Sequence, residues 1–196
     1  MSESKKIRLA TVEDSVALLN IYGEYIKNTS ISFETEVPSV EVFGKRIENT
    51  LERFPWLVCE IDGKVAGYAY ASKHRERAAY QWSADLSIYV DKKYHRKHIA
   101  TALYTALIEL LKSQGYYSAF AGTTVPNPNS EEFHTAFGFQ LIGVFEKVGY
   151  KLGEWRDVKW FKLSLLDYAE TPELPLKIQD IDLKIFEGIV EKAAKL

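Results

Sequence analysis

The stretch from Trp82 to Gln114 constrains the fold more than any other part of the chain. It runs from an apolar, β-branched segment that ends at Val90, through a turn crowded with cations, into a helix with strong apolar periodicity. The cations of the turn are Lys92, Lys93, His95, Arg96, Lys97 and His98. The N-terminus of a helix offers unpaired N–H groups and a positive dipole end, and the cations reinforce both. The stretch therefore predicts a site for a polyanion such as a diphosphate.

A solvated turn is the alternative, and charge alone favours it. The order strand, turn, helix favours the anion site, because α/β proteins commonly present a phosphate pocket in this way. The turn carries neither G-x-G-x-x-G nor G-x-x-x-x-G-K-[ST]. Dinucleotide-binding folds and P-loop nucleotidases are therefore disfavoured, and a different phosphate-bearing ligand is expected.

Composition limits the class of protein. The chain has 196 residues, of which 46% are hydrophobic, which suits one domain with a substantial core. Its 25 Lys and Arg against 27 Asp and Glu leave no global positive field for nucleic acid. A single cysteine, Cys59, excludes an intramolecular disulfide and leaves no Cys/His metal set. The N-terminus lacks the apolar region of a signal peptide, and no apolar run suits a bilayer, so we expect a cytoplasmic protein without a membrane partner.

Periodicity and turn residues predict a mixed α/β (α+β) domain. Strands are expected at 7–9, 56–60, 65–72, 82–90, 117–124, 139–147 and 158–165. Helices are expected at 16–27, 40–54, 99–114, 131–137 and 181–196, with Ser39 and Ser130 as caps of the second and fourth. Val16 and Val40 are assigned to the buried faces of their helices, and 149–155 to a loop between the last two strands. On this pattern we divide the chain into one domain at 1–166 and a C-terminal linker and helix at 167–196.

Several motifs resemble the GNAT superfamily of N-acetyltransferases, in the order in which that family carries them. The strand, turn and helix at 86–111 and the segment Asn127…Gly138-Phe139 are similar to its acetyl-CoA-binding core. Over about residues 6–166 the chain resembles the phosphinothricin acetyltransferase branch, through Phe54-Pro55-Trp56-Leu57-Val58, Ala66-Gly67-Tyr68-Ala69-Tyr70, Ala79-Tyr80-Gln81-Trp82 and Gly149-Tyr150-Lys151-Leu152-Gly153. The resemblance implies the GNAT fold, a mixed and mostly antiparallel central sheet flanked by helices.

The resemblance also implies acetyl-CoA as co-substrate, and no metal. The family's diphosphate loop reads Q/R-x-x-G-x-G/A and is matched by residues 95–100, with His98 where glycine is usual. The imidazole either crowds the cofactor or adds a contact. The implied cofactor contacts are Ile88, Tyr89 and Val90 on the strand edge, Arg96, Lys97, His98, Ile99, Ala100 and Thr101 around the helix start, and Asn127 and Ser130 opposite. For Asn127, the alternative is an ordinary turn residue beside proline that does not contact the cofactor.

Acyl transfer to an amine needs a neutral nitrogen, a donor for the oxyanion and a proton for the leaving thiolate. The resemblance places Asp85 where this branch often carries a glutamate proposed as base, and His134 where it carries the thiolate's proton donor. Aspartate is one methylene shorter, so it is expected to act through water. The alternatives are a carboxylate that orients a neighbouring cation and a histidine that only packs. The backbone N–H near Ile88 is the simplest oxyanion donor, and Cys59 is interpreted as a core residue, so direct transfer is expected.

The acceptor implied by the branch is a small amino acid or an analogue such as phosphinothricin, methionine sulfoximine or methionine sulfone. Arg77 and Tyr80 match positions that hold it, and Phe33 and Trp155 lie in loops that could wall the pocket. A solvated Arg77 and simple burial of the aromatic residues are the alternatives. Two other functions stay open, namely an acetyltransferase for a polyamine or protein N-terminus, and a non-catalytic acyl-CoA-binding domain. A homodimer paired through C-terminal strands is implied, whereas segment 171–196 could instead cover the domain's own surface.

Overall fold

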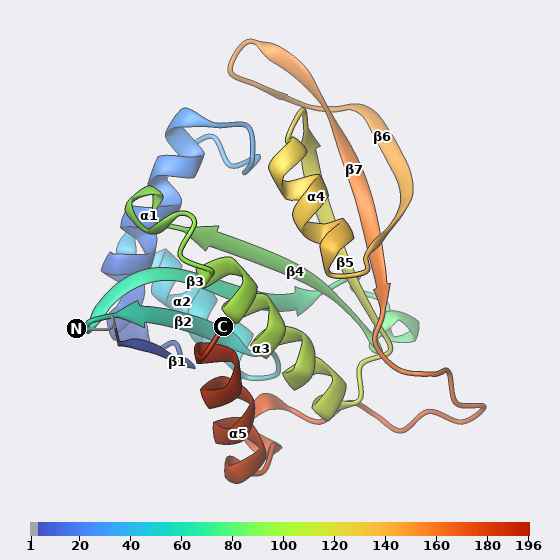
Figure 1. Ribbon diagram of the computed structural model, residues 1–196. Coiled ribbons are helices and arrows are strands. Elements are labelled where there is room, and N and C mark those ends of the chain that lie inside the picture. The colour runs from blue at the N-terminus through green and yellow to red at the C-terminus, as the bar shows by residue number, and fades with distance from the viewer. Residues whose placement is uncertain (1–3) are drawn as a thin grey trace.

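Seven strands form one mixed sheet in the order β1-β2-β3-β4-β5-β7-β6 in the computed structural model, which describes residues 4–196 (Figure 1). The strands are β1 Lys5–Leu9, β2 Trp56–Ile61, β3 Lys64–Lys73, β4 Ser83–Val90, β5 Ser118–Val125, β6 Gln140–Lys151 and β7 Glu154–Ser164. Every neighbouring pair is antiparallel except β4 and β5, which are parallel. The predicted fold class, a mixed and mostly antiparallel sheet with flanking helices, is confirmed.

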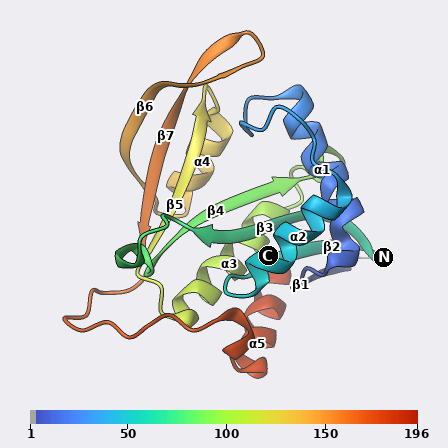
Figure 2. The same cartoon turned by 180° about the vertical axis from the view of Figure 1, so that it is seen from behind.

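Helices cover both faces of the sheet, as the two opposite views show (Figures 1 and 2). They are α1 Ser15–Asn28, α2 Val40–Leu51, α3 Ile99–Gln114, α4 Pro128–Ala136 and α5 Leu183–Ala194. A core between the sheet and α3 is built on fully buried side chains of that helix, such as Leu103, Leu107 and Leu110. A second core, rich in aromatic rings, lies between α1, α2 and the opposite face. The chain thus has two apolar layers with the sheet between them.

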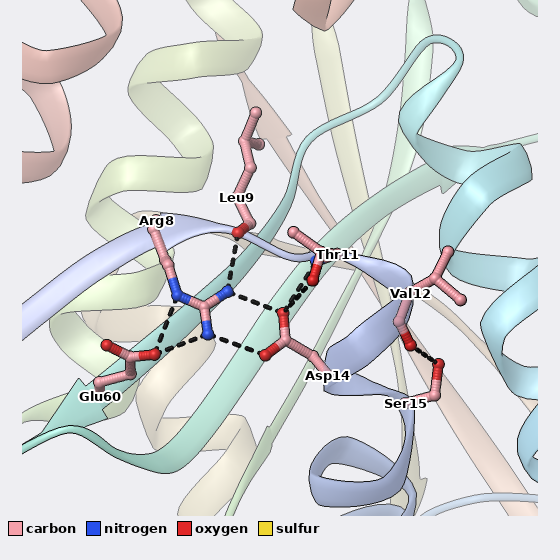
Figure 3. A network of polar contacts seen from close by, with 7 residues as sticks. All are labelled: Arg8, Leu9, Thr11, Val12, Asp14, Ser15 and Glu60. Atoms are coloured by element: carbon pink, nitrogen blue, oxygen red, sulfur yellow. Dashed lines mark hydrogen bonds and ion pairs between the residues drawn. The ribbon is translucent and has the colours of Figure 1, made fainter.

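Two short segments reverse or cap the chain as their residue types favour. The Asp62-Gly63 pair forms the β2–β3 turn, with φ of 49° and 75°. Asp14 caps the segment before α1, since its carboxylate accepts the Thr11 backbone N–H at 2.8 Å. Arg8 donates to this carboxylate and to Glu60 on β2, at 2.7 and 2.6 Å (Figure 3). The network joins the first two strands to the start of α1.

Several element predictions are wrong in detail. The cap of α4 is Asn127 and not Ser130, because Pro128 suits the first helical position and the Asn127 side chain accepts from the Ser130 N–H. The predicted loop at 149–155 is mostly strand, and only residues 152–153 turn, with φ of 53° and 82°. Val16 and Val40 are 55% and 39% exposed, because Val16 lies beside the buried face that begins with Ser15, and Val40 lies in the first turn of α2 before its first buried residue, Phe43.

The C-terminal segment returns to the domain. It crosses below α3 and ends in α5, which packs beside α3 and β1 (Figures 1 and 2). Val190 and Ala193 are buried there, and the Leu176 N–H donates to the Gln114 carbonyl at 2.8 Å. The predicted terminal helix exists, and it covers the surface of its own domain. None of the helices within residues 4–196 is long and apolar enough to cross a bilayer.

Candidate active site

The parallel strands β4 and β5 part after a short contact. They pair only from Ser83 with Ser118 to Asp85 with Phe120, and beyond this point they diverge (Figure 1). The Val90 carbonyl accepts the Tyr25 hydroxyl at 2.7 Å, and so it points away from β3. Backbone groups of residues two apart in a strand point to the same side, so the N–H and C=O of Ile88 face the opening as well. The diverging strands leave a backbone edge exposed to a ligand.

A cleft of about 670 Å³ occupies this opening. The residues predicted to bind a cofactor that line it are Ile88, Val90, Arg96, His98, Ile99, Ala100, Thr101, Asn127 and Ser130. The structure thus brings the strand edge, the helix start and the segment before α4 to one place. Tyr89 does not line the cleft, because its ring packs on the opposite face against Tyr22 and Tyr25. Lys97 does not line it either, and its ammonium lies 5.6 Å from the centre of the Tyr94 ring.

The turn before α3 has an unusual backbone. Arg96 and His98 adopt the left-handed conformation, with φ of 63° and 57°. This conformation costs an L-residue about 1–2 kcal/mol and a glycine almost nothing, which explains physically why a glycine is usual in the loop that this turn resembles. His98 keeps the left-handed backbone despite its side chain, and α3 then starts at Ile99 with N–H groups that lack partners within the helix. The anion-binding shape of the turn is therefore present.

His134 lies behind the cleft and not on its surface. It is 5% exposed and stacks on Phe161, with ring centroids 5.6 Å apart. Its Nδ1 donates to the Ser130 carbonyl at 2.7 Å, and its Nε2, which is 3.0 Å from the Tyr104 hydroxyl, accepts from it. Burial lowers the pKa of His134, although the bond to the Ser130 carbonyl acts in the opposite direction. The imidazole borders the cleft through Ser130, whose Oγ lies 3.4 Å from Nδ1, and through the ring of Phe133.

Asp85 lies where the strands part, and it has a partner that sequence reasoning missed. His74, just after β3, places its Nδ1 2.5 Å from Asp85 Oδ1. Burial raises the pKa of Asp85, and the hydrogen bond from His74 partly offsets this effect. His74 lies in a short polar loop, and its sequence neighbours gave no signal of the pairing. The pairing depends on the β3–β4 register, in which Ser72 faces Asp85.

The residues predicted to bind the acceptor lie in two places. Tyr80 is near Asp85, with its ring edge-on to His74 at 5.9 Å between centroids. Arg77 is exposed in the same loop. The Phe33 ring packs over Gly149, where a Cβ would overlap it. Trp155 is 62% exposed and contacts Tyr150 across the β6–β7 hairpin.

A buried contact joins the loop after α1 to the hairpin. Lys151 is 5% exposed, and its ammonium donates to the Ser32 carbonyl at 2.5 Å. The Ser32 hydroxyl in turn lies 2.8 Å from that of Tyr22 on α1. The segment that carries Phe33 is therefore fixed between α1 and β6, on the face of the sheet opposite α3.

Further residues line the cleft that were not among the predicted cofactor contacts, although His95 belongs to the turn that the sequence singled out. They are Tyr25, Ile31, Tyr94, His95, Asn129 and Phe133. Tyr94, His95, Asn129 and Phe133 adjoin predicted residues, so proximity in the sequence could have found them. Tyr25 and Ile31 come from α1 and its following loop, and only the tertiary structure brings them to the cleft.

Comparisons with known proteins agree with this geometry. A sequence model described as an acetyltransferase (GNAT) domain matches residues 7–160. The phosphinothricin N-acetyltransferase of Streptomyces viridochromogenes is 35% identical over 90% of this chain and 94% of its own length. A methionine sulfoximine/methionine sulfone acetyltransferase of Pseudomonas paraeruginosa is 30% identical over 83% and 95%. The crystal structure of a phosphinothricin acetyltransferase from Sinorhizobium meliloti with acetyl-CoA superimposes with a TM-score of 0.82, at 29% identity over 87% and 94%. The predicted family and enzyme class are confirmed.

Proposed function

The chain belongs to the GNAT acetyltransferase family, and on that premise we propose that it acetylates the amine of a small amino acid or a toxic analogue of one. Its acetyl donor is acetyl-CoA. Phosphinothricin, methionine sulfoximine and methionine sulfone are the acceptors that its relatives' names point to. The observation that carries the proposal is the cleft between the diverging strands, with an anion-binding turn at its base.

Acetyl-CoA would occupy the cleft in an extended form. The unpaired N–H groups at the start of α3, together with Arg96 and His98, suit its diphosphate. The exposed edge at Ile88 suits the pantetheine amides, which would add to β4 as a strand does. Asn127 and Ser130 would close the site from the other side.

The chemistry is direct transfer. Cys59 is fully buried and burial raises the pKa of its thiol to about 11, which argues against an acyl-enzyme. The Ile88 N–H would stabilise the oxyanion. The leaving thiolate would receive its proton from the Ser130 hydroxyl, and a protonated His134, whose Nδ1 lies 3.4 Å from Ser130 Oγ, would replace that proton and return to its neutral form. Asp85 would serve proton removal on the acceptor side.

Charge supports an acidic acceptor over a polyamine. Lys73 at the end of β3 and Arg75 and Arg77 in the following loop lie on the side of Asp85, and the Arg75 guanidinium lies over the Trp160 ring at 5.7 Å. A cationic acceptor would need free carboxylates there, whereas Glu76 pairs with Lys73 at 3.1 Å and Asp85 pairs with His74. Arginine binds carboxylate, phosphinate and sulfonyl oxygens well.

A second copy of the chain is the proposed partner. The exposed large apolar side chains of the β6–β7 hairpin are Leu141, Ile142, Val144, Phe145, Val148, Tyr150, Leu152 and Trp155. β6 is also the edge of the sheet. An apolar edge of this length favours pairing with another edge, so a homodimer is expected through β6.

We further place the enzyme in the cytoplasm, because its one cysteine stays a buried thiol.

Release of CoA thiol from acetyl-CoA tests the proposal. The acceptors would be phosphinothricin, methionine sulfone, methionine sulfoximine, ordinary amino acids and spermidine. We expect turnover with the acidic analogues, reduced by His134→Ala, and none with spermidine. Acetyl-CoA binding without turnover on any amine would instead support the non-catalytic domain, and absence of acetyl-CoA binding would overturn the proposed donor.

A further inference from the structure

Resting on the proposed function, we infer that His74 is the general base of the reaction and that Asp85 is the residue that positions it. The imidazole lies within hydrogen-bond distance of the carboxylate, with Nδ1 2.5 Å from Oδ1. A carboxylate can only accept, so Nδ1 carries the proton and Nε2 carries the lone pair. This arrangement fixes one tautomer, as a carboxylate does for a catalytic histidine in other enzymes.

The imidazole is held rigidly. It stacks on Phe120 of β5 with centroids 4.1 Å apart and planes 13° apart. Trp160 of β7 meets it edge-on at 6.3 Å, and Tyr80 meets it at 5.9 Å. Its side chain is 11% exposed. Three rings and a carboxylate restrict the orientation far more than a solvated loop histidine requires.

The second ring nitrogen is available for chemistry. Among residues 4–196 no hydrogen-bond partner exists for His74 Nε2. His74 also lines a cavity of about 130 Å³, together with Arg75, Phe120, Ile142, Gly143, Phe145 and Trp160. The cavity combines apolar walls with the guanidinium of Arg75. It suits an acceptor that has an apolar stem and an acidic group.

The side chains of His74 and Asp85 lie on the side of the sheet from which an acceptor can approach. Ala84 and Leu86 pack in the core beneath α3, and side chains alternate along a strand, so Asp85 faces the opposite side. The cofactor cleft, by contrast, includes the start of α3. Asp85 is also the last residue of β4 that pairs with β5 before the strands part. An acceptor beside His74 would therefore meet a thioester in the cleft through the gap between the strands.

The length of Asp85 supports the role of His74. Aspartate is one methylene shorter than glutamate, and its Oδ1 is occupied by His74. Imidazole changes charge near neutral pH, which makes it a better proton acceptor for an amine than a carboxylate is. The His74 imidazole thus places a proton acceptor farther from β4 than the Asp85 carboxylate alone could, and it is the stronger base of the two.

His74 Nε2 accepts a proton from the acceptor ammonium, and the nitrogen lone pair forms a C–N bond to the thioester carbonyl carbon. The C–S bond breaks with its electron pair on sulfur. The nitrogen loses a second proton as the amide forms, the thiolate takes up one proton, and one proton leaves to solvent through the imidazolium. No oxidant, reductant or acyl-enzyme is needed.

His74→Phe is the direct test, since phenylalanine keeps the stack on Phe120 and lacks the nitrogens. With phosphinothricin as acceptor, we expect kcat/KM at neutral pH to fall about 10²–10⁴-fold. Acetyl-CoA affinity should stay within about twofold of wild type, because His74 is not part of the cofactor cleft. His74→Gln, which can still bond to Asp85 but cannot accept the proton, should lose activity similarly, and it serves if His74→Phe does not fold.

The pH profile separates a base from a packing residue. Besides Asp85, the titratable or charged groups near the imidazole are Arg75 and Tyr80, while β5 and β7 present the rings of Phe120 and Trp160. In wild type, log kcat/KM should rise with pH and then reach a plateau, as a reaction served by a single base requires. In His74→Gln it should keep rising with pH, and free imidazole should restore activity to His74→Ala.

Equal activity of wild type and His74→Gln, with the same pH profile, would overturn the inference and leave the proposed function intact. A wild type that binds acetyl-CoA but turns over no acceptor would overturn both. Loss of activity with an unchanged profile and no rescue by imidazole would assign His74 to packing alone.

Discussion

The left-handed backbone at His98 makes a stability prediction that two variants can isolate. His98→Gly and His98→Ala both remove the imidazole, and they differ only in the Cβ. At φ of 57° and ψ of 18°, the Cβ costs about 1–2 kcal/mol in the folded state. The glycine variant loses about 0.4–1 kcal/mol of its free energy of unfolding, because its unfolded chain has the greater conformational entropy. The difference predicts that His98→Gly is more stable than His98→Ala by about 1 kcal/mol.

Urea unfolding followed by circular dichroism measures this difference, and thermal melts should place His98→Gly about 2–4 °C above His98→Ala. Acetyl-CoA affinity of the two variants should agree within about twofold, because the N–H groups of the turn are the same in both. If His98→Ala were as stable as His98→Gly, or more so, the strain argument would fail. A much weaker affinity of His98→Ala alone would mean that the turn keeps its shape only with glycine or histidine.

Three further predictions concern other parts of the fold. Burial alone would raise the pKa of Asp14, but bonds from Arg8 lower it below its ordinary value of 3.8, so its stabilisation is present above that value and lost as pH falls further. The stability gap between wild type and Asp14→Asn in urea should therefore close on acidification. Asn127→Ala should cost about 1 kcal/mol in urea unfolding, and Asn129→Ala, inside α4, clearly less. Cys59 should react with a thiol reagent at about pH 8 only after unfolding, and rapid labelling of the native protein would contradict its burial.

Much of the fold was predictable because local signals and tertiary structure agree. The Asp62-Gly63 turn, the apolar stripe of α3 and the Gly115 stop each follow from a few neighbouring residues. Errors arose where two local signals compete. Ser130 and Asn127 are both good caps, and Pro128 decides between them. The aromatic and glycine residues of 149–155 suit a loop as well as a tight hairpin.

The cofactor side of the site was more predictable than the acceptor side. The diphosphate turn is continuous in sequence, so a motif locates it. The acceptor side depends on strand register, which sets Asp85 beside His74 across β3 and β4. A single-residue change in register would turn Asp85 to the opposite face. No periodicity in a single sequence fixes such a pairing to one residue, and so the histidine was missed.

The C-terminal segment has a consequence for where this protein can be shortened. The family match ends at residue 160, inside β7, yet the chain beyond it is hydrogen-bonded to the part of the fold that the match covers. The Gln114 side-chain amide, on a residue 2% exposed, donates to the carbonyls of Arg53 and Leu176, both at 2.8 Å. The Trp82 indole donates to the Glu173 carbonyl at 2.7 Å.

A chain cut after residue 166 would therefore remove an acceptor from a buried amide and uncover the apolar flank of α3. Such a fragment would carry every cofactor motif and still be prone to aggregate. The family match thus ends well before the last buried contact of the chain, which is made by Ala193 on α5.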